Sequence, residues 1–276
     1  MSDSIPAPSR GALPAFAIED DRALAALVNL IAVLADGEYF YGKRISEWSM
    51  GAPSLELGVA CAAIAQEKLG HARALYPLLE ELPWPNAPGV LEREGDRARH
   101  YCVSCLDAPF PGWDHVVAAF ALVGPAQAVV FEALAASAYE APARTIRRIV
   151  EEERLNAGLA GGLVRDLVAA PPGVALLQAR VDEVLPEMLC WFGPRGEPGV
   201  EALTRARILA MDNETMRQTY LDRVAPPLLD AGLRLPVRRA AGGGAWEYGE
   251  LPWNRWNGLQ RRFGPSATTG QTTTGA

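Results

Sequence analysis

The segment AQEKLGHARAL at residues 65–75 places a lysine and a histidine three residues apart in helix-like sequence. Residues three apart on a helix share a face, and Glu-x-x-His is how a helical bundle offers a carboxylate and an imidazole to one metal ion. Here the first position is Lys68 and the second is His71. A protonated amine cannot coordinate a metal, and it repels a nearby cation. The segment therefore combines the position of a metal ligand with a residue that opposes metal binding.

A second segment repeats this arrangement. Residues 151–157, EEERLNA, align without gaps on QEKLGHA of the first segment. The alignment pairs Lys68 with Glu153 and His71 with Asn156. Asparagine can bind iron through its oxygen, but it is a weaker donor than imidazole. Each segment thus keeps half of a Glu-x-x-His pair.

Helical periodicity predicts that these residues face the interior of a bundle. Apolar residues recur at alternating spacings of three and four along the first, second and fourth predicted helices. The polar residues within these apolar seams are Glu38 in the first helix, Lys68 and His71 in the second, and Glu153 and Asn156 in the fourth. Since the seam of each helix points inward, we expect these side chains to meet. A carboxylate pair left unpaired there would carry a desolvation cost, and Lys68 could supply the missing cation.

Several alternatives remain open from the residues alone. In the third predicted helix, Gln127 lies within the apolar stripe and Glu132 lies beside it, so both are candidates for a further ligand. Glu153 belongs to the run EEE, and a rotation of its helix would turn a neighbouring carboxylate inward. Lys68 could instead extend to the edge of the bundle, and His71 could be an ordinary hydrogen-bonded core histidine.

Proline and glycine divide the chain into long helical stretches with little strand-like alternation. The predicted helices span residues 20–48, 53–82, 113–140, 142–170, 174–192 and 199–231. Gly124-Pro125 predicts a kink within the third helix. The expected organisation is an N-terminal arm over 1–19, a helical domain over 20–235, a C-terminal docking extension over 236–265 and a disordered tail over 266–276.

Composition limits the classes of function. The chain has 276 residues, 49% of them apolar, which suits one sizeable domain. A net charge of -7 and a pI of about 5.1 argue against nucleic acid or an anionic membrane as the main partner. No apolar run reaches the roughly 18 residues of a spanning helix, and residues 1–19 lack the pattern of a signal peptide. We therefore expect a cytoplasmic protein.

Four longer segments carry a family resemblance. They read EYFYGKRISEWSMGAPSLELGVACAAIAQEKLGHARALY, VLPEMLCWFGPRG, DNETMRQTYLDRVAPPLLDAGLRLP and WEYGELPWNRWNGLQRRFGP. In their order they resemble the ferritin-like subunits of the phenylacetyl-CoA epoxidase system, a multicomponent bacterial oxygenase of phenylacetate breakdown. The resemblance covers about residues 20–265. The C-terminal segments are more similar to the catalytic, iron-bearing subunit than to its structural sister subunit.

The resemblance implies an all-α fold: a ferritin-like four-helix bundle with two additional C-terminal helices and an irregular C-terminal extension. It places Glu38 on the first iron ligand, Lys68 on the second-helix glutamate and His71 on its histidine. The catalytic subunit carries Glu-x-x-His twice, whereas this chain departs from that pattern twice. The remnant or altered metal site then comprises Glu38, His71, Glu132 and Glu153, with Lys68 and Asn156 as its substituted positions.

Two functions follow from this combination. The leading hypothesis is a structural or regulatory subunit of such an oxygenase, with a degenerate di-iron site that holds no metal or only a partial iron complement. The alternative is a non-haem iron monooxygenase with altered ligands, acting on an aromatic or acyl-CoA substrate. Either would form a homo- or hetero-oligomer with other ferritin-like oxygenase subunits, with an acyl-CoA as a further expected ligand. A third hypothesis is a homo-oligomeric ligand-binding bundle that keeps the acyl-CoA groove without redox chemistry.

Overall fold

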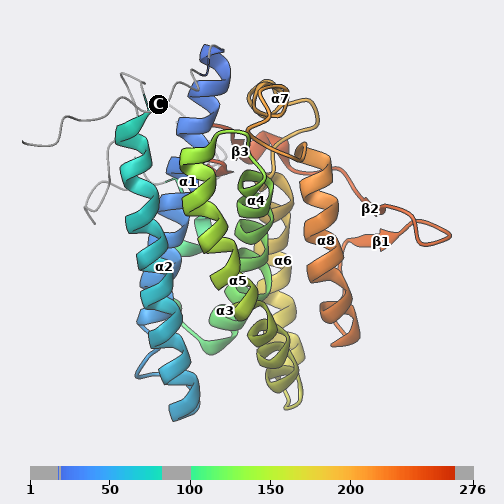
Figure 1. The fold of residues 1–276 in the computed structure, drawn as a ribbon. Coiled ribbons are helices and arrows are strands. Elements are labelled where there is room, and N and C mark those ends of the chain that lie inside the picture. The colour runs from blue at the N-terminus through green and yellow to red at the C-terminus, as the bar shows by residue number, and fades with distance from the viewer. Residues whose placement is uncertain (1–17, 19, 83–100, 265–276) are drawn as a thin grey trace, which may run out of the picture.

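Long helices dominate the computed structural model, which describes residues 18, 20–82 and 101–264 (Figure 1). The helices are α1 (Asp21–Ser46), α2 (Leu55–Glu81), α3 (Trp113–Ala118), α4 (Gly124–Ala135), α5 (Glu140–Val168), α6 (Gly173–Trp191), α7 (Pro198–Arg205) and α8 (Asn213–Asp230). The expected all-α class is confirmed. The tail predicted over 266–276, and the arm over 1–19 apart from Ile18, lie outside the described residues.

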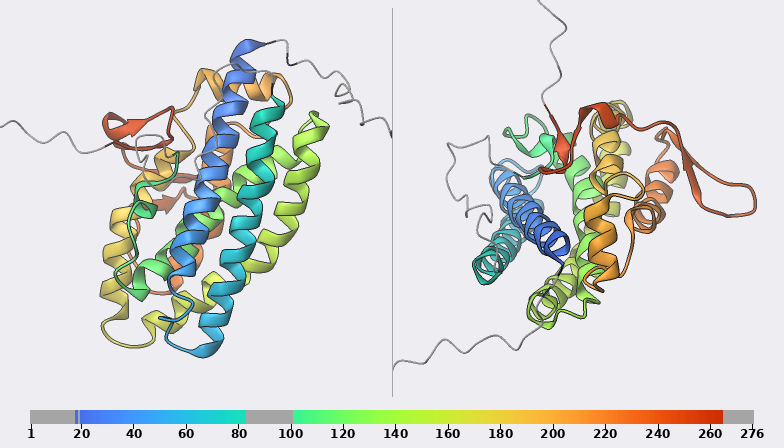
Figure 2. Two further views of the ribbon diagram at one scale, coloured as in Figure 1. Left: turned by 90° about the vertical axis from the view of Figure 1, so that its left-hand side faces the viewer. Right: turned by 90° about the horizontal axis from the view of Figure 1, so that it is seen from above.

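The helices form a bundle to which α6, α7 and α8 are added on one side (Figure 2). Helix α1 packs along α2, α4 packs on α5, and α2 faces α5 across the bundle, while α6 and α8 cover the other side of α3 and α4. A Cβ atom at Gly42 of α1 would lie 3.0 Å from the Cβ of Lys68 and 3.1 Å from the carbonyl oxygen of Ala65. Glycine at this position therefore allows α1 and α2 to approach closely beside Lys68.

Two helical segments are apolar because they fill the core. Asp21–Ser46 and Trp113–Ala135 are long and apolar enough to cross a membrane, but 78% of the apolar window of each is buried inside the protein. Asp20 caps α1 by accepting hydrogen bonds from the backbone N–H groups of Arg22 and Ala23. Their burial identifies both segments as interior helices of the bundle.

The third predicted helix runs through α3 and α4 and changes its hydrogen-bonding pattern midway. A π-helical turn spans Ala119–Val123, directly before the Gly124-Pro125 pair for which the sequence predicts a kink. Because Pro125 has no N–H, a regular α-helical pattern cannot pass through it, and turns of this kind are often found at functional sites. The helix ends at Ala135 rather than at the predicted residue 140.

The prediction of one helix over 199–231 is wrong. The chain leaves α7 through Arg207, which has a positive φ of 58°, and α8 starts afresh at Asp212, whose side chain accepts from the backbone N–H of Thr215. Ile208 and Leu209, between the two helices, are buried. Burial of these two side chains and a new N-cap thus break a stretch that helical propensity alone would continue.

The C-terminal extension contains short strands in addition to irregular chain. Strands β1 (Val237–Arg239) and β2 (Trp246–Tyr248) pair antiparallel, as do β3 (Trp256–Asn257) and β4 (Arg262–Phe263). The backbone N–H of Trp246 donates to Gln218 of α8 over 2.7 Å, and that of Phe263 donates to the buried carboxylate of Glu187 in α6 over 2.8 Å. The extension therefore docks on helices of its own chain.

Candidate functional site

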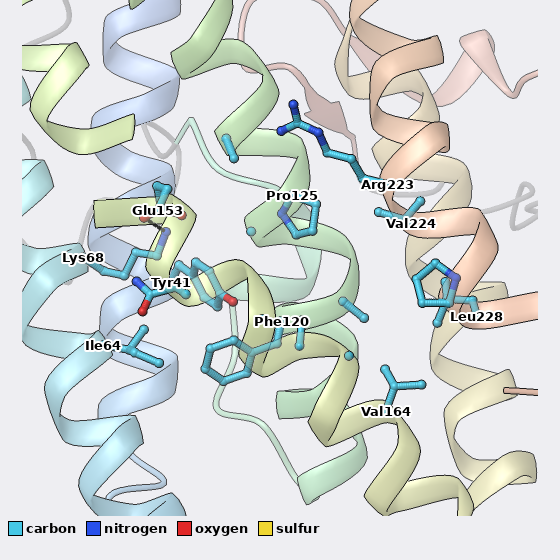
Figure 3. A pocket seen from close by; sticks show the side chains of 18 residues that line it. Tyr41, Ile64, Lys68, Phe120, Pro125, Glu153, Val164, Arg223, Val224 and Leu228 are labelled. Atoms are coloured by element: carbon cyan, nitrogen blue, oxygen red, sulfur yellow. Dashed lines mark hydrogen bonds and ion pairs between the residues drawn. The ribbon is translucent and has the colours of Figure 1, made fainter. Parts of the chain in front are cut away.

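Lys68 lies between two carboxylates in the interior of the bundle. Its Nζ donates to Oε1 of Glu38 in α1 over 3.1 Å and to Oε1 of Glu153 in α5 over 2.6 Å. All three side chains are buried, with relative exposures of 2% for Lys68, 0% for Glu38 and 7% for Glu153. Figure 3 shows the Lys68 side chain reaching from α2 toward Glu153. The ammonium group thus lies between two carboxylates, in the place where a metal ion bound by both of them would lie.

His71 is held by a carboxylate at each ring nitrogen. Its Nδ1 lies 2.7 Å from Oε2 of Glu38, and its Nε2 lies 2.7 Å from Oε2 of Glu152. Arg148 in turn donates to the other oxygen of Glu152 over 3.1 Å. A metal-ligating histidine is commonly oriented by a carboxylate on its second nitrogen, and Glu152 occupies that place. Of the run EEE, two members therefore reach the cluster, whereas the sequence predicts only Glu153 as a site residue.

The cluster raises the pKa of both of its basic members, Lys68 and His71. Burial alone would lower the pKa of Lys68, but the adjacent charges of Glu153 and Glu38 outweigh burial and raise it. Burial likewise acts to lower the pKa of His71, and the hydrogen bond and charge of Glu38 outweigh it, so this pKa is raised as well. The interior therefore holds an ammonium group and an imidazole that favours its charged form.

The two buried acids differ in their ionisation. Burial opposes ionisation of Glu38, but Lys68 and His71 outweigh it and hold the pKa of this carboxyl below its usual value. Glu153 has Lys68 as its main cationic partner, so burial and the negative charge of Glu38 prevail and raise its pKa. Glu38 therefore stays ionised to a lower pH than an ordinary glutamate, whereas Glu153 takes up a proton at a higher pH than an ordinary glutamate.

The other residues predicted for the site lie around this cluster. Asn156 donates from its Nδ2 to Oε2 of Glu67 on α2 over 2.8 Å. Glu132 lies in an ion pair with Arg223 of α8, 2.5 Å away, and outside the group formed by the cluster. Gln127 is buried against Gly37 of α1, and its Oε1 has no hydrogen-bond partner among the residues that the structure describes. The third helix thus brings no carboxylate to Lys68.

The donor set decides whether these residues fit a metal centre. One ligand atom each from Glu38, His71 and Glu153 lie within 4.8 Å of one another, which is the spacing around a single ion. A di-iron centre of the bundle type uses four carboxylates and two imidazoles. The described cluster has two fully buried carboxylates, one imidazole and an ammonium group that binds both carboxylates. These residues do not fit a di-iron centre.

A cavity of about 440 Å³ adjoins the cluster (Figure 3). Lys68 and Glu153 form its polar end, and its remaining wall is mainly apolar. Tyr41 of α1 also lines it, and the Nζ of Lys68 lies 5.0 Å from the centroid of the Tyr41 ring. Tyr41 is not among the residues that the sequence predicts for the site. Its spacing of three from Glu38 is the sequence signal that could have placed it at the site.

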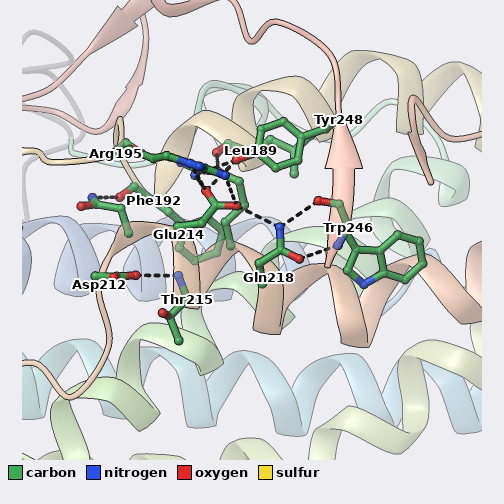
Figure 4. A network of polar contacts seen from close by, with 12 residues as sticks. Leu189, Phe192, Arg195, Asp212, Glu214, Thr215, Gln218, Trp246 and Tyr248 are labelled. Carbon is green, nitrogen blue, oxygen red and sulfur yellow. Dashed lines mark hydrogen bonds and ion pairs between the residues drawn. The ribbon is translucent and has the colours of Figure 1, made fainter. Parts of the chain in front are cut away.

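A second polar network buries a cation far from this cluster, at the carboxyl end of α6. Arg217 of α8 is 1% exposed, donates to the carbonyl oxygen of Leu189 over 2.8 Å and also donates to that of Gly193. Its guanidinium also contacts Glu214 over 2.5 Å, and Glu214 accepts from the Tyr248 hydroxyl over 2.6 Å (Figure 4). The network joins α6, α8 and the C-terminal extension.

Comparison with known proteins identifies the family. A family model described as phenylacetic acid catabolic protein matches residues 14–262. No curated protein matches the chain. The fold of this family is ferritin-like, which agrees with the helical bundle described above and with the resemblance seen in its sequence segments. Because the match spans most of the sequence, the chain belongs to the phenylacetic acid catabolic protein family.

Proposed function

We propose that the chain is a structural or regulatory ferritin-like subunit of a multicomponent oxygenase of the phenylacetyl-CoA epoxidase type. The observation that supports this role is the position of Lys68, whose ammonium group binds Glu38 and Glu153 at 3.1 and 2.6 Å. A fixed positive charge between two buried carboxylates balances them without a metal ion. The bundle can then keep the shape of an oxygenase subunit while the metal chemistry resides in a sister subunit.

The remaining donors support the same role. Asn156 bonds to Glu67, and Glu132 bonds to Arg223, so neither adds a ligand to the cluster. The C-terminal extension keeps the segments that resemble the catalytic subunit, and it packs on its own α6 and α8. We place the protein in the cytoplasm, in an oligomer with other ferritin-like subunits.

Iron loading tests the proposal. After anaerobic incubation with Fe(II) and desalting, we expect much less than one iron per chain and no absorption change on exposure to oxygen. Two irons per chain with an oxygen-reactive absorption band would contradict it. Lys68→Glu is the informative variant, because it exchanges the ammonium for a carboxylate and should raise the iron content. Lys43→Glu is the matched control, since Lys43 is the other lysine of the sequence and lies outside the cluster.

One observation favours a second candidate, an oxygenase that uses a single metal. His71 is oriented by Glu152 as metal-ligating histidines are, and two carboxylates with one imidazole suffice for a non-haem iron with open positions. In this alternative Glu38, His71 and Glu153 would hold the ion, and an aromatic or acyl-CoA substrate would react beside it. It predicts that Glu38→Ala and His71→Ala abolish both metal content and oxygen consumption. Unchanged values in both variants would exclude it.

A further inference from the structure

The hairpin of β1 and β2 projects from the helical bundle beside α8 (Figures 1 and 2). Its strands pair antiparallel, with Arg238 opposite Glu247 and Arg239 opposite Trp246. Within the part of the chain that the structure describes, the sheet has these two strands alone. Each edge of such a ribbon presents backbone N–H and C=O groups that a further strand can bind. The partners of the two edges therefore decide whether the hairpin can be extended.

The outer edge of β2 is satisfied by a glutamine side chain. Gln218 of α8 donates from Nε2 to the carbonyl oxygen of Trp246 over 2.9 Å, and its Oε1 accepts from the Trp246 N–H over 2.7 Å (Figure 4). Gln178 of α6 binds the backbone of Arg234 in the same way, over 2.9 and 2.8 Å. A glutamine amide offers the same kinds of donor and acceptor as a peptide group. Each amide thus takes the place of a neighbouring strand.

The outer edge of β1 has no such partner. Along an antiparallel pair, residues that bond to the opposite strand alternate with residues whose backbone groups point away from it. Trp246 bonds outward, so Arg239 opposite it and Val237 two residues earlier also turn their N–H and C=O groups outward. Ala240 fits this alternation, because its N–H bonds across the hairpin over 3.0 Å. The outward groups of Val237 and Arg239 bind none of the described residues, and we call them the open edge.

The open edge is basic. Residues 231–246 contain Arg234, Arg238 and Arg239 and no acidic residue, although the net charge of the chain is -7. The side chains of Arg238 and Arg239 are 82% and 44% exposed, and their partners Glu247 and Asp222 are each 50% exposed. Ion pairs with this much exposure contribute little, so a carboxylate of a bound segment can replace either partner. The charges therefore favour an acidic segment at the open edge.

A cleft of about 440 Å³ adjoins the base of the hairpin. Residues 235–238 form much of its lining, so it lies beside the open edge, and Leu235, Pro236 and Tyr248 give it apolar surface. An apolar side chain of a bound segment fits this space. A second copy of the chain is disfavoured, because two β1 strands paired antiparallel about Arg238 would place like charges opposite each other.

We propose that the open edge of β1 binds an extended, acidic segment of a partner protein as a third strand. In this mode of recognition, backbone hydrogen bonds to Val237 and Arg239 hold the segment, and alternate side chains determine its identity. Carboxylates of the segment lie beside Arg238, and an apolar residue lies in the cleft. The hairpin contains no residue of the Lys68 cluster, so the proposal goes beyond the proposed function and its test is separate from iron content.

NMR titration of the isotope-labelled full chain tests the site with three capped peptides. They are Glu-Val-Glu-Val-Glu, Lys-Val-Lys-Val-Lys and the acidic peptide with every backbone nitrogen methylated. We expect the acidic peptide to shift the amide signals of β1 and the basic peptide to bind at least about tenfold more weakly. The methylated peptide should cause no shift, because it keeps the carboxylates but cannot donate hydrogen bonds to the open edge.

Two substitutions of Val237 provide a matched pair. Val237→Pro removes an outward N–H that takes no part in the pairing of β1 with β2, and it should weaken binding of the acidic peptide by about fivefold. Val237→Ala also shortens the side chain but keeps the N–H, so the affinity should stay within about twofold. Circular dichroism and melting temperature show whether each variant is folded, and the methylated peptide tests the same hydrogen bonds in the unaltered chain.

Several results would overturn the proposal. They are equal affinity for the acidic and basic peptides, binding of the methylated peptide, and shifts confined to residues outside the hairpin. Analytical ultracentrifugation of the chain alone adds a further test. Dimerisation that Val237→Pro abolishes and Val237→Ala preserves would assign the open edge to a second copy of the chain instead.

Discussion

Two of the buried cations, Lys68 and Arg217, have hydrogen-bond partners of different kinds. Lys68 is bound by carboxylates from α1 and α5, so its partners are all side chains from separate helices. Arg217 is bound mainly by the carbonyl oxygens at the end of α6, with Glu214 as its charged partner. Relative exposures of 2% and 1% show that the two cations are equally removed from solvent.

The kind of partner distinguishes the two cations: Arg217 binds backbone groups at a helix end, and Lys68 binds the side chains of the candidate site. Helix ends leave carbonyl oxygens without partners, and a buried guanidinium with several N–H groups satisfies them. Arg261 extends this pattern, because its Nε donates to the carbonyl oxygen of Trp191 over 2.9 Å. No backbone group requires Lys68 in the same way, since its hydrogen bonds serve Glu38 and Glu153. Lys68 therefore joins side chains of three helices, whereas Arg217 binds the carbonyl oxygens at the end of α6.

The largest expected effect comes from removing the cation of the first network. Lys68→Met removes the ammonium group shared by Glu38 and Glu153 and leaves only His71 beside them, so it should lower the free energy of unfolding by about 3–5 kcal/mol at neutral pH. Urea denaturation followed by circular dichroism measures this loss. Adding Glu38→Gln and Glu153→Gln to the same variant should restore most of the stability. If the single variant is as stable as the parent, the ion pairs do not contribute as described.

Removing the cation of the second network should have a somewhat smaller effect. Arg217→Met leaves the carbonyl groups of Leu189 and Gly193 without this donor, which should cost about 2–3 kcal/mol and loosen the C-terminal extension. Limited proteolysis will detect the loosening as cleavage near residues 236–264. Arg217→Lys keeps the charge but cannot reach the same acceptors, so it should rescue only part of the loss. Full rescue by lysine would remove the distinction between the two networks.

Glu214 of the second network and His71 of the first should contribute to stability with opposite dependence on pH. The Tyr248 hydroxyl, Gln218 and Arg195 outweigh burial and hold the pKa of Glu214 at about 2, so its stabilising effect is present above about pH 4.5 and is lost as the pH falls toward 2. The raised pKa of His71 gives the reverse sign, with stability present below pH 6.5 and lost as the pH rises through the folded value.

Glu214→Gln tests the acid side of this contrast. The variant should reduce the loss of stability between about pH 4.5 and 2 by about 1–2 kcal/mol, a value reduced for solvent screening because Glu214 is partly exposed. His71→Phe should leave the contribution of Glu214 intact and alter the slope above pH 6.5. Denaturation series at several pH values distinguish the two variants, and an identical acid response in Glu214→Gln and the parent would contradict the assignment.

The smallest expected effect concerns the outer partner of His71. Glu152→Gln removes a partly exposed carboxylate from Nε2 and should lower the pKa of His71 slightly. The chain has three histidines, so the His71 resonance can be assigned and titrated by NMR. Glu151→Gln changes the adjacent, exposed glutamate and should leave this pKa unaltered. Equal shifts in both variants would mean that Glu152 acts only through its general charge.

The sequence predicted most of the helices and the inward direction of the seam. Glu38, Lys68, His71 and Glu153 could be predicted because each interrupts an apolar stripe of period 3.5 to 3.6, which fixes the direction of the side chain. The break between α7 and α8 could not, because it depends on the burial of Ile208 and Leu209 against other helices. Local helical propensity carries no information about such distant contacts.

The details of the site depend on how each helix is rotated about its axis and on which side chains pair, and the spacing of residues in the sequence does not determine either. Glu152 and Glu153 are adjacent, and only the packing of α5 on α2 shows that one contacts the imidazole from outside while the other contacts the ammonium from inside. The sequence pattern allows Glu132 as a third-helix ligand, but in the fold it accepts a hydrogen bond from Arg223 of α8, 91 residues later in the chain. Pairings over such separations follow from the fold and not from any local sequence.

Because Lys68 is buried, its reactivity toward reagents in solution reports the opening of the bundle. Only Lys43 and Lys68 are lysines, and Lys43 is half-buried while Lys68 is 2% exposed. An amine-reactive reagent can therefore acylate Lys68 only in molecules whose bundle has opened. The modified fraction of this residue, read by mass spectrometry, reports how often α1, α2 and α5 separate under native conditions.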